Sequence, residues 1–110
     1  MSTPAVSAAL AQWQRNWAVA DELRVNLVDL DAELFPVAYT AATRAFYAAA
    51  ERAEDARWSV WDEIGASAGS ATAALFEVLS ESSRDQRRQP SDPADVEAAM
   101  KAVWLGPAAT

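Results

Sequence analysis

The sequence predicts an all-α protein, a small helical bundle of three to four helices with long first and second helices in an antiparallel arrangement. Two observations lead to this expectation. Only three glycines occur in 110 residues while alanine is abundant, and alanine has the highest intrinsic helix propensity. Apolar residues also recur at helical rather than alternating spacing. We expect residues 1–110 to form a single helical-bundle domain.

The first helix is predicted to begin at Pro4, with Thr3 as its N-cap. Beyond Pro4 the gaps between apolar residues alternate between four and three and average about 3.5, which places them in one long stripe on one face. We expect Trp13 and Trp17 to fill the core. The stripe consists of Val6, Leu10, Trp13, Trp17, Ala20, Leu23, Leu27, Leu30 and Leu34.

Pro36 is expected to end or kink this helix, because its ring clashes with the carbonyl four residues earlier. A continuous rod would leave its apolar stripe without cover, so we expect a corner at Pro36 followed by a second long helix. The stripe of that helix is rich in alanine. It consists of Tyr39, Ala42, Phe46, Ala49, Ala53, Ala56, Val60 and Ile64.

Two shorter helices are predicted to follow. The segment 65–69 contains two glycines and should break or thin the second helix. The third stretch carries Ala71, Leu75, Val78, Leu79 and Ser82 on its apolar face, with Phe76 beside them, and should end near Arg84, Arg87 and Arg88. After a loop at 89–91, Asp92 caps a last helix that starts at Pro93. Its apolar face is Val96, Ala99, Met100, Val103 and Trp104.

Composition excludes several kinds of chemistry. The chain has no cysteine and no histidine, so disulfides, thiol nucleophiles and imidazole bases are impossible. The net charge of −7 argues against nucleic acid and anionic membranes, because both attract excess positive charge. The longest uncharged run, residues 64–76, is too short to span a bilayer, and we expect a cytoplasmic protein. We predict no catalytic residue, cofactor or metal.

Two features point to a protein partner. The leucine-rich half of the first stripe, residues 23–34, faces an alanine-rich second stripe, and apolar area left wet favours recruiting another chain. Trp58 shares a helical face with Tyr47, Glu51 and Glu54, and an aromatic residue on an acidic face is typical of interfaces. Trp61 borders the second stripe. The predicted partner-binding residues are Leu23, Leu27, Leu30, Leu34, Tyr47, Trp58 and Trp61.

These features predict a non-catalytic protein–protein interaction module: an adaptor, an accessory subunit or a protein inhibitor. The partner is expected to be a second copy, giving a homodimer, or another helical protein. One alternative is a magnesium-dependent all-α nucleotide hydrolase that uses Glu51 and Glu54, because MazG-type enzymes hold Mg²⁺ with such a pair. The further carboxylates that such a site needs would come from Glu81 with Asp85 or from Asp92 with Asp95, and neither pair has the required spacing.

A second alternative comes from a resemblance. The stretch Ala41-Ala42-Thr43-Arg44-Ala45-Phe46, between two long striped helices, resembles the small helical-hairpin substrates of type VII secretion. Tyr47-x-x-x-Glu51 is similar to the secretion signal of that family. Ala38-Tyr39-Thr40 stands where the family carries a Trp-x-Gly turn, so both hallmark residues are missing. The resemblance implies a secreted helical hairpin.

Overall fold

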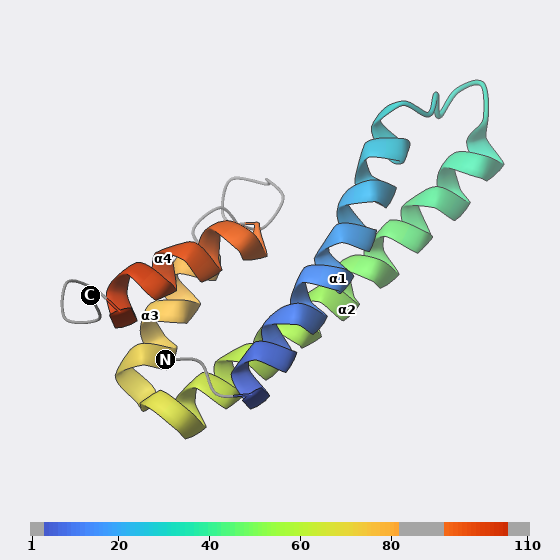
Figure 1. Cartoon of the computed structure of the whole chain (residues 1–110). Helices are drawn as coiled ribbons and strands as arrows, with labels where there is room; N and C mark the ends of the chain where they lie inside the picture. The colour runs from blue at the N-terminus through green and yellow to red at the C-terminus, as the bar shows by residue number, and fades with distance from the viewer. Residues whose placement is uncertain (1–3, 82–91, 106–110) are drawn as a thin grey trace.

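The computed structural model describes residues 4–81 and 92–105, and these form four α-helices without a strand. The helices are α1 (Pro4–Val28), α2 (Pro36–Ala68), α3 (Ser70–Glu81) and α4 (Pro93–Leu105). Helices α1 and α2 pack along each other as a long antiparallel hairpin, and α3 and α4 stand beside one end of it (Figure 1). The predicted all-α bundle with two long antiparallel helices is therefore confirmed.

The corner between α1 and α2 lies earlier in the chain than expected. Helix α1 ends at Val28, although its apolar stripe was predicted to continue as helix to Leu34. The Asp31 carboxylate accepts hydrogen bonds from the backbone N–H groups of Glu33 at 2.8 Å and Leu34 at 3.1 Å. Such a local side-chain turn competes with helical hydrogen bonding and sets the loop at residues 29–35.

Pro36 has a different role from the one predicted. It does not end the first helix but is the first residue of α2. A proline is well suited to this position, because the first N–H groups of a helix have no intrahelical partner and the ring presets a helical φ. The expectation of a corner rather than a continuous rod is confirmed.

The break between α2 and α3 is confined to one residue. Helix α2 continues through Gly65 to Ala68, and only Gly69 leaves the helical conformation, with φ of +93°. Glycine alone adopts that conformation readily, so it allows α3 to start at the next residue.

The buried face of α3 differs from the predicted one. Its buried residues are Ala73, Phe76 and Ser80, while Ala71 and Val78 are exposed. The turn at Gly69 sets this rotation of the helix. The predicted α3 residues Leu75 and Leu79 do pack against the core. The expectations for Ser82, Arg84, Arg87, Arg88 and the loop at 89–91 lie outside the described residues.

Helix α4 starts where the sequence predicts. The Asp92 carboxylate accepts a hydrogen bond from the backbone N–H of Ala94 at 2.8 Å, which satisfies one of the first free donors of the helix. Val96 and Met100 are buried, as expected for its apolar face. The side chains of Val103 and Trp104 lie outside the described part of the chain.

One hydrophobic core joins all four helices at the base of the hairpin. Trp13 of α1 meets Phe76 of α3 edge-on, with 5.4 Å between ring centroids, and both side chains are almost fully buried. Trp17 is half-buried and packs against the same core. The buried members are Val6, Leu10, Trp13, Ala56, Val60, Ile64, Ala73, Phe76, Val96 and Met100.

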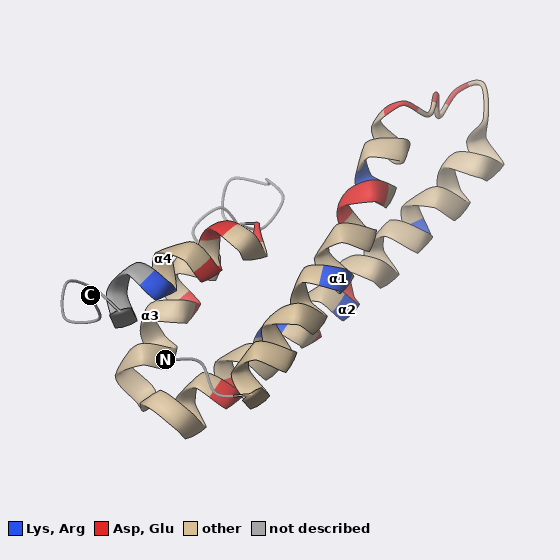
Figure 2. Cartoon of the chain, in the orientation of Figure 1, with Lys and Arg blue, Asp and Glu red and all other residues tan. Residues whose placement is uncertain are grey.

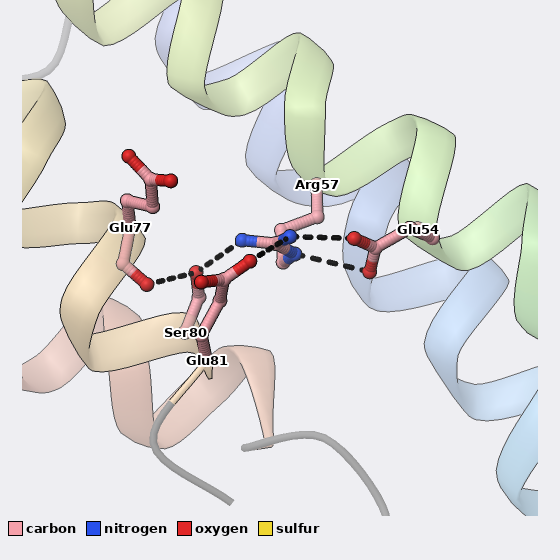
Figure 3. Close-up of polar contacts among 5 residues, drawn as sticks. All are labelled: Glu54, Arg57, Glu77, Ser80 and Glu81. Carbon is pink, nitrogen blue, oxygen red and sulfur yellow. Dashed lines mark hydrogen bonds and ion pairs between the residues drawn. The ribbon is translucent and has the colours of Figure 1, made fainter. Parts of the chain in front are cut away.

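A buried arginine stands at the end of this core that faces the hairpin loop. Arg57 of α2 is 1% exposed. Its guanidinium donates to the carboxylate of Glu54, to the Ser80 hydroxyl at 2.8 Å and to the Glu81 carboxylate at 2.9 Å (Figure 3). The Ser80 hydroxyl donates in turn to the Glu77 carbonyl. This network joins α2 to the last turn of α3, and it marks where the apolar packing between these two helices ends.

Arg57 remains charged in this position. Burial alone lowers the pKa of its guanidinium, but the hydrogen bond and charge of Glu54 and the charge of Glu81 outweigh burial and raise the pKa above its ordinary value. The guanidinium therefore keeps its positive charge over the pH range in which proteins fold.

Replacing Trp13 by alanine should lower the free energy of unfolding by about 3–5 kcal/mol, because it leaves a cavity where all four helices meet. Denaturation by urea, followed by circular dichroism, measures this change. Val19→Ala is the control on the same helix, since Val19 is 48% exposed and its truncation should change stability by no more than about 0.5 kcal/mol. Equal effects of the two substitutions would contradict a core confined to the base.

Arg57→Ala should lower the free energy of unfolding by about 3 kcal/mol. This value is at the lower end of the range for breaking a buried pair, because Glu54 and Glu81 keep access to water. Arg57→Lys should recover little, since an ammonium cannot reproduce the forked geometry. Arg52→Ala, at an exposed position of the same helix, serves as the control and should leave the denaturation midpoint unchanged.

Candidate interaction surface

The hairpin extends well beyond the core, and we call its outer part, residues 19–47, the arm. Within the arm only Ala20 is buried. Seven of the nine large apolar side chains that are exposed among the described residues nevertheless belong to the arm. Such a concentration of wet apolar side chains is typical of a binding surface rather than of a free surface. They are Val19, Val25, Val28, Leu34, Phe35, Val37 and Tyr47.

Charges are distributed unevenly over the arm. The segment 36–50 of α2 contains one charged residue, Arg44, while the loop at 29–35 carries Asp29, Asp31 and Glu33 and no basic residue. Figure 2 shows the acidic residues gathered at the loop, and the stretch of α2 that follows it with a single basic residue. A helix exposed to solvent normally presents a charged face. This stretch lacks one, as is typical of a helix that packs against another protein segment.

The side of α1 on which α4 lies can be followed into the arm. Gln14 of α1 donates a hydrogen bond to Glu97 of α4 at 3.1 Å, so Gln14 faces α4. Residues 11 and 14 positions further along a helix lie on nearly the same side. These positions are Val25 and Val28, which are 46% and 73% exposed. On the side of α1 that α4 covers at the base, the arm thus presents the exposed Val25 and Val28. Asp21, seven positions beyond Gln14, lies on the same side and is paired with Arg24 at 3.0 Å.

Helix α2 shows the same continuity. Arg57 faces α3, and residues 11 and 18 positions before it, Phe46 and Tyr39, lie on the same side of α2. Both are half-buried, and the adjacent Tyr47, 66% exposed, stands in contact with Phe46 at 5.5 Å between ring centroids. We call this side of the hairpin the arm face. It consists of Val25, Val28, Tyr39, Phe46 and Tyr47.

The predicted leucines occupy two different environments. Leu23, Leu27 and Leu30 are half-buried. Leu27 lies seven residues beyond the buried Ala20 and therefore on the inner side of α1, toward α2. Leu34 is 71% exposed in the loop, at the outer end of the arm.

The two predicted tryptophans of α2 lie at the base, beside the arginine network. Trp58 and Trp61 pack edge-on with 5.6 Å between ring centroids, and the Arg57 guanidinium lies 4.7 Å from the centre of the Trp58 ring. Trp58 is 36% exposed. Trp61 is half-buried and packs against the core, with a buried Nε1 that has no hydrogen-bond partner. Part of the Trp58 ring is therefore exposed to solvent, whereas Trp61 packs between this ring and the core.

The carboxylates considered for a metal do not gather. Glu51 is exposed, whereas Glu54 and Glu81 are both bound to Arg57. Within residues 4–81 and 92–105 there is no group of three or more acidic side chains that could hold a metal ion. Asp85 lies outside the described residues, and Tyr47 and Glu51, which resemble a secretion signal, stand in the middle of α2.

Sequence reasoning missed three residues of this region. Val25 and Val28 lie off the main stripe. They could have been recognised as apolar residues on the side of the helix that is expected to be polar. Arg57 lies among Ala53, Ala56 and Val60 of the second stripe, so a charged residue within an apolar stripe was the available sign of a buried ionic contact.

Comparisons with known proteins found no match, so the proposal for the function rests on the geometry of the chain. No protein-family model matches the chain, and no curated protein or solved structure matches it either. None of the helices in the described part of the chain is both long enough and apolar enough to cross a membrane.

Proposed function

We propose that this protein is a non-catalytic interaction module whose arm binds another helical protein. The observation that carries the proposal is the open side of the hairpin. At the base this side is covered by α3 and α4, and in the arm it continues with the exposed side chains of Val25, Val28 and Tyr47. A helical partner would extend the packing of the bundle along the arm.

The chemistry of the arm supports a macromolecular partner over a small molecule. A shallow groove at the outer end of α2 is lined by Pro36, Val37, Thr40, Ala41 and Arg44. It offers one cation and no carboxylate, and it is open rather than enclosing. Small-molecule sites bury most of their ligand, whereas side chains of a packed helix need only shallow grooves.

A non-catalytic role is part of the same proposal. The chain lacks histidine and cysteine, and the carboxylates of Glu54 and Glu81 are held by Arg57. These side chains serve the contact between α2 and α3. The cytoplasm, expected from the sequence, is the location in which we propose that the module acts.

Photo-cross-linking in the living host tests the arm as a binding surface. Replacing Tyr47 by p-benzoylphenylalanine should give a discrete cross-linked protein adduct on irradiation, because a partner would lie against this ring. The same amino acid at Val78, which is 67% exposed on α3 at the base, is the matched control and should give none. Adducts of equal yield at both positions, or at neither, would contradict the proposal.

Val28→Glu adds a second check. Val28 is 73% exposed, so the substitution should leave the melting temperature almost unchanged. A carboxylate in the centre of an apolar contact should nevertheless remove the adduct formed at position 47. Val78→Glu introduces the same charge at the base and should leave that adduct intact. Loss of the adduct in both variants would place the contact elsewhere.

A further inference from the structure

We infer that the partner of the arm is a second copy of this chain, packed antiparallel so that the two arm faces bury each other. The inference rests on the proposed function of the arm as a helix-binding surface. In this dimer, the arm of one copy takes the place along the other arm that α3 and α4 take at the base. The two hairpins then form two stacked layers, each of two helices, and the base of each copy stands at an opposite end of the dimer.

The arrangement of residues on α2 is self-complementary. Thr43 stands at the centre of the arm part of α2, with Tyr39 four residues to one side and Tyr47 four residues to the other. All three are half-buried or exposed. A twofold axis at Thr43 brings Tyr39 of each copy to the level of Tyr47 of the other, which is the pairing required of an isologous interface. The small central residue leaves room for the rings at both ends.

The position of α3 and α4 decides the direction of the second copy. Both stand on the same side of the hairpin as the arm face, as the contacts Gln14–Glu97 and Arg57–Glu81 show. In a parallel dimer the two bases would occupy the same level on facing sides and collide. In an antiparallel dimer each loop ends against the base of the other copy, so the arms overlap fully and the bases stay apart.

Charge favours the same direction. The loop at 29–35 carries three acidic residues and no basic one, so a parallel dimer would set two acidic loops side by side. The antiparallel dimer places them at opposite ends. It also brings the exposed apolar residues Leu34 and Phe35 of each loop to the level of residues 51–52 of α2 in the other copy.

The size of the contact sets its strength. About half of the arm would enter the interface, which is fewer residues than the roughly 20–30 a side of standard stable complexes. We therefore expect a reversible dimer that dissociates on dilution in the micromolar range. Val28→Glu should weaken it at least tenfold in sedimentation velocity, and Val78→Glu should not weaken it.

Cysteine cross-linking of the purified full-length chain tests the direction, because the chain has no cysteine of its own. Single-cysteine variants are treated with a short bis-maleimide. Thr43→Cys should cross-link to itself, since position 43 lies at the proposed axis. Ala32→Cys, in the loop, should not cross-link to itself but should cross-link to Glu51→Cys in a mixture of the two variants. Ser59→Cys, at an exposed position of the base, is the negative control.

The outcomes separate this inference from the proposed function. Self-cross-linking of Ala32→Cys would show parallel arms and overturn the inference. A wild-type chain that sediments as a monomer at all concentrations up to hundreds of micromolar would also overturn it. In that case a cross-linked adduct with a different protein at position 47 would leave the proposed function standing, whereas failure to form any adduct would remove the function as well.

Discussion

A mismatch in helix length governs the structure of this protein. At about 1.5 Å per residue, α2 is roughly 50 Å long and α1 nearly 40 Å, while α3 and α4 each reach only about 20 Å. The two short helices can therefore cover one end of the hairpin and no more. The core lies at that end, and the overall shape, 57 × 22 × 21 Å, follows from the part of the hairpin that projects beyond it. Because the short helices do not cover the arm, its apolar residues stay exposed, and our functional proposal rests on this exposure.

The Arg57 network separates these two regions. On one side of it, Val60, Ile64 and Phe76 pack in the hydrophobic core, and on the other side α2 has no described helix against its outer face. A buried guanidinium with three partners fixes the last turn of α3 against α2 and so holds the base together at its boundary with the arm. Because the acidic partners come from both helices, the contact is specific to this register. This contact supports our proposal that the base keeps its structure while the arm binds a partner.

Much of the fold could be predicted from the sequence, because it depends on local signals. The antiparallel hairpin, the start of α4 at Pro93 and the burial of Trp13 follow from stripe periodicity and capping. The end of α1 could not be predicted, since the Asp31 side chain ended the helix while the apolar spacing continued to Leu34. The rotation of α3 depends on the single turn at Gly69. For the proposed interaction surface, Leu34 was predicted from the leucine-rich stripe, and Tyr47 and Trp58 from an aromatic residue on an acidic face. Val25 and Val28 required knowledge of where α4 stands.

Amide hydrogen exchange of the full-length chain tests most directly whether the arm lacks the cover that the base has. In dilute solution the account predicts strong protection for residues 6–17 and 56–76 and much faster exchange for residues 21–48, because local opening is cheapest where few apolar contacts are buried. At high protein concentration residues 36–50 should gain protection while the base does not change. Uniform protection along α1 and α2 in dilute solution would contradict the account, since it would show an arm that is complete without a partner.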